Sequence, residues 1–188
     1  MNGFYGWAGS ILYVNLKTGH AHTEPTSRFA RNFLGGRGIN WAILYDKVKP
    51  RTDSLSPENV LGIGVGVLVG TITPSACRFS VDAKNPFTGG IGSGNGGGHW
   101  APELKYSGYD NIFIFGKAEK PIYLWIDNGR VECRDAKNLW GRTTWQTSEL
   151  IREELADPDI QVLSIGPAGE NLCLAAALIA NNGRAVGR

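Results

Sequence analysis

The sequence has few cysteines, little net charge and no long apolar run. Its three cysteines are Cys77, Cys133 and Cys173, and none belongs to a CxxC pair. An odd and dispersed set argues against a disulfide framework and against a self-contained zinc or iron–sulfur site. Residues 1–7 also lack a basic region followed by an apolar one, so no secretory signal is expected. The sequence therefore predicts a reducing, cytoplasmic location.

The low charge and the lack of long apolar runs limit the classes of partner. The formal net charge is +2 over 188 residues, without a basic cluster, so nucleic acid is not an expected partner. No apolar run reaches the ~20 residues that span a bilayer, so no membrane association is expected. With 42% hydrophobic residues, a chain of this length normally folds around one core. We therefore expect a single domain over residues 1–188.

Glycine is abundant, and seven of the 26 glycines fall within residues 89–98. A stretch with so few side chains cannot pack a core of its own, and its ordering costs much backbone entropy. It offers peptide groups and room for another molecule. A flexible linker is the alternative, but the run lies between two strongly patterned segments and carries Asn95 in its middle. We interpret it as a loop that binds a ligand.

Two familiar motifs receive little support. Gly92, Gly94 and Gly97 match GxGxxG, but a dinucleotide fold requires a strand directly before this loop and an acidic residue after the next strand. Here a proline-containing turn comes first, and Asp110 precedes the next strand. His20 and His22 have the spacing of two metal ligands on one strand face, yet such pairs without a third ligand are more often surface residues.

The residues around the glycine run are better candidates for a site. A helix that begins after a glycine-rich loop presents free N–H groups, which suit an anion, and His99 lies at this point. Arg78, Arg184 and Arg188 are candidates for phosphate contacts because guanidinium binds phosphate through two hydrogen bonds. Each arginine taken alone has the alternative of an ordinary surface residue.

Strands outnumber helices in the pattern, and tight turns join several strands, so an α+β domain is expected. Gly62, Gly64 and Gly66 recur at every second position, which predicts a flat strand face where something can lie against the backbone. The segment 172–179 is apolar and is compatible with strand or helix. The expected strands cover residues 11–16, 20–24, 60–69, 78–81, 112–115, 122–126, 131–134 and 161–165. The expected helices cover residues 27–34, 39–48, 100–106 and 143–155.

An ordered set of short motifs runs along essentially the whole chain. They are GWAGSILYVNL (6–16), FLGGRG (33–38), LSPEN (55–59), NPFTGG (85–90), ELKYSGYD (103–110), GKAEKP (116–121), LWGR (139–142), IGPAGEN (165–171) and GRAVGR (183–188). In this order they resemble the N-terminal domain of the tungsten-containing aldehyde ferredoxin oxidoreductase family. The resemblance implies an α+β fold in which two β-sheets, related by a pseudo-twofold, form a saddle for the cofactor.

The resemblance also implies a cofactor and its ligands. Two pyranopterins would hold one tungsten, and a magnesium ion would bridge their phosphates. Backbone carbonyls of Asn95 and Ala185 would hold the magnesium. The implied cofactor-binding residues are Arg78, Asn95, Gly96, Gly97, Arg184, Ala185, Gly187 and Arg188.

The resemblance further implies the oxidation of aldehydes to carboxylates, with ferredoxin as the electron acceptor. The family's [4Fe–4S] ligands and catalytic residues lie in later helical domains, so those domains or a partner chain would be needed, and a homodimer is an option. Residues 99–106 also resemble the active-site subunit of the benzoyl-CoA reductases. A non-catalytic cofactor-binding or assembly module is a further alternative.

Overall fold

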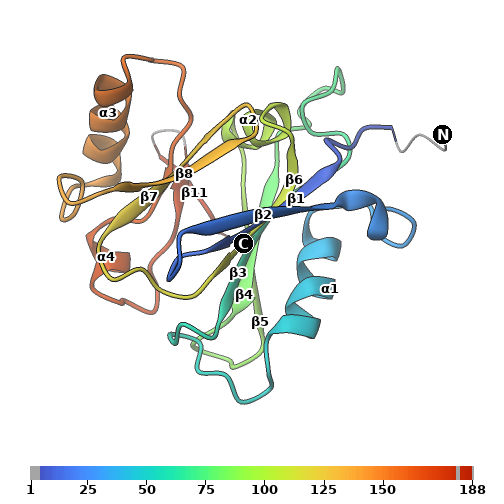
Figure 1. Ribbon diagram of the computed structural model, residues 1–188, viewed down its shortest axis with the longest axis horizontal. Coiled ribbons are helices and arrows are strands. Elements are labelled where there is room, and N and C mark those ends of the chain that lie inside the picture. Colours follow the sequence, from blue (N-terminus) through green and yellow to red (C-terminus); the bar gives the residue numbers. More distant parts are fainter. Residues whose placement is uncertain (1–4, 181–182, 188) are drawn as a thin grey trace.

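The computed structural model describes residues 5–180 and 183–187. Its main element is a six-stranded sheet in the order β2-β1-β6-β3-β4-β5 (Figure 1). The adjacent strands β1 and β6 are parallel, and every other neighbouring pair is antiparallel. The strands are β1 (Ser10–Asn15), β2 (His20–Pro25), β3 (Val60–Val65), β4 (Phe79–Lys84), β5 (Ile91–Gly96) and β6 (Tyr109–Phe115).

Helix α1 (Arg37–Lys47) covers one face of this sheet, over β3 and β4. Side chains alternate along a strand, so Ile11 and Tyr13 of β1 point to the α1 face and pack there with Phe113. Their neighbours Leu12 and Val14 point to the opposite face and belong to a different core cluster. The strand β1 is therefore buried on both faces, which explains its nearly continuous apolar sequence.

The opposite face is covered by α2 (Trp100–Tyr106) and by the second half of the chain. That half contains the hairpin of β7 (Ile122–Asp127) and β8 (Arg130–Asp135), helix α3 (Thr144–Leu155) and the short α4 (Pro167–Glu170). It ends in a small sheet of β9 (Leu163–Ser164), β10 (Ile179–Ala180) and β11 (Arg184–Ala185). In the part of the chain that the structure describes, no helix is long and apolar enough to cross a membrane.

The expected α+β class with more than one sheet is confirmed. The second sheet of the expectation corresponds to two smaller ones in the described residues, the three-stranded β9–β11 sheet and the two-stranded β7–β8 hairpin. The helix expected over residues 143–155 is confirmed as α3, and a capping box starts it: the Thr143 side chain accepts a hydrogen bond from Gln146 N, and the Gln146 side chain accepts one from Thr143 N.

Two expected elements differ. The helix expected over residues 27–34 is only a 3-10 turn, η1 (Thr26–Arg28). The Thr26 hydroxyl, directly before the expected helix, donates to the buried Asp110. The segment 172–179 is mostly irregular and reaches β10 only at Ile179.

The prediction that the glycine run is a loop is wrong. Residues Ile91–Gly96 form β5, which pairs with β4 along its whole length. The alternate glycines make room for neighbours: an added Cβ would lie 2.8 Å from Val186 Cγ1 at Gly94 and 2.3 Å from the Phe79 ring at Gly96. Pairing with β4 and packing under these side chains outweigh the poor strand propensity of glycine.

The flat face of β3 is also not a ligand surface. An added Cβ at Gly64 would lie 2.8 Å from Asn40 Oδ1 and 2.2 Å from Asn111 Nδ2, and at Gly62 it would lie 2.8 Å from the Phe113 ring. Side chains of α1 and of β6 therefore occupy the space that these glycines leave. Only the last residue of the pattern, Gly66, faces open space.

Candidate cofactor-binding site

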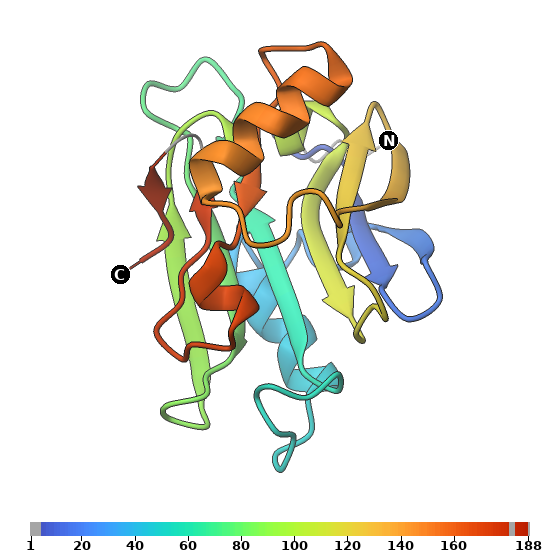
Figure 2. The same ribbon diagram turned by 90° about the vertical axis from the view of Figure 1, so that its left-hand side faces the viewer.

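The edge of the main sheet at β5 is bordered by the C-terminal segment. Asn95 N donates to Gly187 O at 2.7 Å, and Gly187 N donates back to Asn95 O at 3.1 Å. Val186 N donates to Leu178 O at 2.8 Å and so links the same segment to the residue directly before β10. Figure 2 shows the C-terminal segment in dark red beside the light-green β5. Residues distant in sequence thus meet along one line of backbone.

Arg78 approaches from the other side of β5. Phe79 lies opposite Gly96 in the β4–β5 register, and Arg78 and Gly97 are the next residues at that end. The site residues that the structure brings to this edge are Arg78, Asn95, Gly96, Gly97, Arg184, Ala185 and Gly187. Arg188 lies outside the described residues. Their roles toward a cofactor and magnesium stay a prediction.

Two arginines at this edge have free guanidinium groups. Arg78 and Arg184 are both exposed. Within residues 5–180 and 183–187, neither side chain forms a hydrogen bond or an ion pair. Some arginines elsewhere are paired, as Arg28 is with Glu24, whereas others are also exposed and unpaired among the described residues, so the place of Arg78 and Arg184 beside open backbone is what distinguishes them. A guanidinium held near open backbone and left unpaired is suited to bind an anionic ligand.

Glycine at two positions of this edge has no explanation within the described chain. A Cβ added at Gly97 or Gly187 would meet nothing within 4 Å, and neither residue has the left-handed φ that favours glycine. Side chains would therefore fit at both positions as far as the chain's own packing is concerned. They would, however, fill the open space next to Arg78 and Asn95. This open space fits a large ligand that lies against the backbone.

The backbone of Asn95 is compatible with the predicted magnesium contact. Its carbonyl oxygen accepts one hydrogen bond, from Gly187 N at 3.1 Å. A carbonyl oxygen has two lone pairs, so one remains for a cation. Oxygen ligands of this kind are those that Mg²⁺ prefers.

A groove of about 430 Å³ opens beside Arg78. It is lined by Leu34, residues 66–69 and residues 75–78. Val65 lies opposite Phe79 in the β3–β4 pairing. Gly66, directly after β3, and Arg78, directly before β4, therefore lie at the same end of the sheet. The open Cβ position of Gly66 thus belongs to the same end of the sheet as that of Gly97. Sequence analysis detected the spacing of Gly66 but assigned it no place in the site.

The histidines and cysteines do not gather at this edge. His99 is exposed and precedes α2, without a side-chain capping bond. His20 and His22 lie on β2, at the opposite edge of the sheet, with ring centroids 5.8 Å apart. The three cysteines are free, and burial raises the pKa of the Cys133 thiol. Among the described residues, no group of three or more His, Cys, Asp or Glu is placed to hold a metal ion.

Sequence analysis missed a buried polar network beneath α1. The Asp82 carboxylate is fully buried and accepts from Asn40 Nδ2 at 2.7 Å and from Trp41 Nε1 at 2.8 Å. Asn111 Nδ2 donates to Asn40 Oδ1 at 2.8 Å. The available signal was an asparagine at an apolar position of the helix and an aspartate within an apolar strand. The periodicity of apolar residues does not reveal that these two polar residues contact each other, because it counts apolar positions only.

Comparison with known proteins identifies the family. Residues 11–188 match the family model described as "Aldehyde ferredoxin oxidoreductase, N-terminal domain". The chain belongs to this family. It is 43% identical over 185 residues to the tungsten-containing aldehyde ferredoxin oxidoreductase of Pyrococcus furiosus, and 42% identical to that of Thermococcus kodakarensis. These alignments cover 98% of this chain but 31% of each relative. The chain thus spans about a third of their length.

A solved structure is also similar. The active-site complex BamBC of benzoyl-coenzyme A reductase, in complex with 1,5-dienoyl-CoA, superposes with a TM-score of 0.94 at 40% sequence identity. The match covers 97% of this chain and 28% of that one. This chain is therefore similar in sequence to both kinds of enzyme, and similar in fold to the benzoyl-coenzyme A reductase complex. The relatives are enzymes, and this chain corresponds to one domain of them.

Proposed function

We propose that the β5 edge binds a tungsten bis-pyranopterin cofactor. The observation that carries this proposal is the pair of unpaired arginines, Arg78 and Arg184, beside backbone that is open at Gly97 and Gly187. Arginine binds phosphate through two parallel hydrogen bonds, and bare backbone lets a large planar group approach closely. Membership of a family that includes tungsten-containing enzymes supports this assignment.

In this proposal each group at the edge has a role. Arg78, Arg184 and Arg188 bind the phosphates. The carbonyls of Asn95 and Ala185 would hold magnesium, and the glycines at 96, 97 and 187 would leave room for the pterins. When bound, the tungsten centre supplies two-electron chemistry, and the chain orients it and excludes competing contacts. Our proposal for the whole protein is cytoplasmic oxidation of an aldehyde to a carboxylate, with electrons passed through a [4Fe–4S] cluster of other domains to ferredoxin.

A second function is favoured by the structural comparison. The similarity to the benzoyl-coenzyme A reductase complex, at 40% identity, nearly equals the 43% identity to the Pyrococcus furiosus enzyme. Both functions use the same proposed cofactor edge, so they differ in substrate and not in the role of this chain. Viologen reduction with aldehydes, compared with reduction of an aromatic acyl-CoA by a low-potential donor, distinguishes the two in the full-length protein. Aldehyde-dependent viologen reduction is the expected result.

The proposed cofactor site is tested by arginine substitution in the full-length protein. Arg78→Ala or Arg184→Ala removes a charged hydrogen-bond partner, which costs on the order of 1.5–3 kcal/mol of binding. We expect lower tungsten and pterin content per chain. Arg28→Ala is the matched control, because Arg28 is also an exposed arginine but follows β2 at the opposite edge of the sheet. Unchanged tungsten and pterin content in both edge variants would remove the assignment.

This chain alone is not expected to catalyse aldehyde oxidation. Its cysteines are dispersed, so an iron–sulfur cluster that carries electrons away must come from outside it. Purified 188-residue protein, loaded with cofactor, is expected to contain tungsten but to show no aldehyde-dependent viologen reduction. Measurable turnover would show that the electron path does not require other domains, and absence of tungsten binding would favour a different role for the edge.

A further inference from the structure

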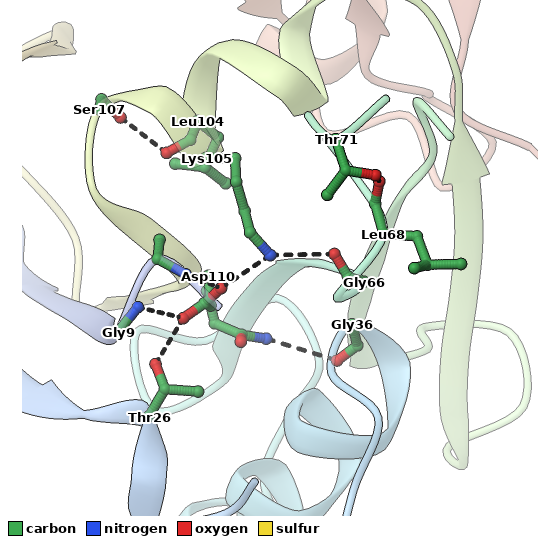
Figure 3. A network of polar contacts seen from close by, with 12 residues as sticks. Gly9, Thr26, Gly36, Gly66, Leu68, Thr71, Leu104, Lys105, Ser107 and Asp110 are labelled. Atoms are coloured by element: carbon green, nitrogen blue, oxygen red, sulfur yellow. Dashed lines mark hydrogen bonds and ion pairs between the residues drawn. The ribbon is translucent and has the colours of Figure 1, made fainter. Parts of the chain in front are cut away.

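A buried lysine lies directly behind the proposed site. The Lys105 ammonium is 3.0 Å from Asp110 Oδ1 and donates to Gly66 O at 3.1 Å. The exposed fractions of the two side chains are 8% for Lys105 and 0% for Asp110. Figure 3 shows the ammonium between the carboxylate and the Gly66 carbonyl. Such an ion pair requires good geometry, because desolvation of both charges is costly.

Asp110 is held by several other donors. Its Oδ2 accepts from Gly9 N at 2.8 Å and from the Thr26 hydroxyl at 2.7 Å, and its Oδ1 accepts from Ala8 N at 2.9 Å. These donors fix the carboxylate against β1 and the segment before it. Lys105 is therefore the link between a rigidly held anion and the Gly66 carbonyl.

The second partner of Lys105 begins the segment that leads to Arg78. Gly66 follows β3, and the chain then runs through residues 67–77 to Arg78 and β4. Helix α2 contacts this segment at other points as well. The Tyr106 hydroxyl donates to Gly70 O at 3.1 Å. At the far end the Trp100 ring packs on Phe79, with ring centroids 5.0 Å apart.

The same helix also continues the glycine strand. Gly97, Gly98 and His99 lie between β5 and α2. Arg78 comes directly before Phe79 and Gly97 directly after Gly96, and Phe79 and Gly96 form the last pair of the β4–β5 ladder. A displacement of α2 would therefore move Gly97 relative to Arg78. The contact of Lys105 with Gly66 and Asp110 fixes α2 to both the 66–78 segment and β6.

We propose that Lys105 is a positioning residue for the cofactor edge: its bridge between Asp110 and the Gly66 carbonyl holds the 66–78 segment, and with it Arg78, against Gly97. This inference rests on the proposed function of that edge. Lys105 itself does not touch the ligand. It acts through the ends of β3 and β5: Lys105 contacts Gly66 after β3, and residues 97–99 join β5 to α2.

The experiment compares three variants of the full-length protein. Lys105→Met keeps the aliphatic length but removes the bridge. Lys105→Met/Asp110→Asn removes the bridge together with the buried negative charge. Its amide nitrogen must face one of the donors that Asp110 accepts from, so its melting temperature is measured beside that of the single variant. Thr26→Val is the matched control, because it removes one hydrogen bond to the same carboxylate without touching the Gly66 carbonyl. The readouts are tungsten and pterin per chain, melting temperature, and amide exchange over residues 66–70.

We expect both Lys105 variants to hold less than half of the wild-type tungsten and pterin and to exchange faster over residues 66–70. Thr26→Val should hold at least nine-tenths of the wild-type content despite its lower melting temperature. Wild-type content in either Lys105 variant overturns the proposal. Parallel loss of content in Thr26→Val overturns it too, because the network would then be merely structural. Failure of the cofactor site itself is recognised separately, by wild-type content in Arg78→Ala.

Discussion

Glycine occurs for opposite reasons in two regions of this molecule. Under α1, Gly62 and Gly64 of β3 are enclosed by Asn40, Asn111 and Phe113, and a Cβ at either residue would collide with them. At the β5 edge, Gly97 and Gly187 face open space.

The difference shows which glycines bear on function. At β3 the protein's own packing accounts for the missing side chain. At the edge nothing within the described chain does, and this open space is what the proposed cofactor site requires. A cluster of glycines in a sequence therefore indicates close approach without telling whether the approaching group is internal or a ligand.

The largest expected effect is at the internal site. Gly64→Ala would place a Cβ 2.2 Å from Asn111 Nδ2 and 3.0 Å from Gly36 O, so the α1 network must shift. We expect the free energy of unfolding to fall by about 3 kcal/mol, the upper part of the range for overpacked cores. Chemical denaturation of the cofactor-free protein measures it. A change below ~0.5 kcal/mol would show that the α1 face is as open as the edge.

The pH dependence of stability tests how dry the α1 face is. Burial, with a contribution from Glu24, raises the pKa of Tyr13 to about 12 from its ordinary 10.0. Since the folded pKa lies above the unfolded one, the stabilisation is complete below pH 10 and is lost as the pH rises toward 12. The loss by pH 12 is about 2 kcal/mol. Comparison with Tyr13→Phe, which lacks this titration, isolates it; equal slopes in the two proteins would contradict the burial argument.

Neighbouring glycines of the β5 region provide a matched pair for the comparison. Gly96→Ala would place a Cβ 2.3 Å from the buried Phe79 ring, so we expect a loss of roughly 1–2 kcal/mol in the free energy of unfolding. Gly97→Ala meets no such obstacle. Denaturation curves of the two cofactor-free variants, measured together, should therefore differ clearly, and similar stabilities would remove the distinction between internal and open glycines along this strand.

The smallest expected effect on stability is at Gly97. An alanine there should raise the free energy of unfolding of the cofactor-free protein by about 0.4–1 kcal/mol, because it restricts the unfolded chain at a position without left-handed φ. The same variant should lower tungsten and pterin content in the full-length protein, because the methyl group occupies the space proposed for the cofactor. Greater stability with unchanged cofactor content would mean that the open space serves no ligand.

Local patterns predicted much of the fold. The strands expected over residues 11–16, 122–126 and 131–134 are present as β1, β7 and β8, and the helix expected over residues 143–155 is present as α3. The turn at Asn128–Gly129 joins the paired strands β7 and β8, and its composition is typical of a tight hairpin. These features depend on residues within one or two turns of each other. The glycine strand was missed because its stability comes from β4 and from Phe79 and Val186, none of which local propensity includes.

The α+β class, the family and the candidate residues could all be predicted from the sequence, because these depend on local periodicity and on ordered motifs. Which of the candidate residues meet became visible only in the folded chain. Asn95 pairs with Gly187, and Arg78 lies beside Gly97, through backbone pairing between distant segments. The tertiary structure also decided that Lys105 and Asp110 are buried together rather than exposed. The physical reason is that burial and pairing depend on which segments pack against each other, and no short window of sequence contains both partners.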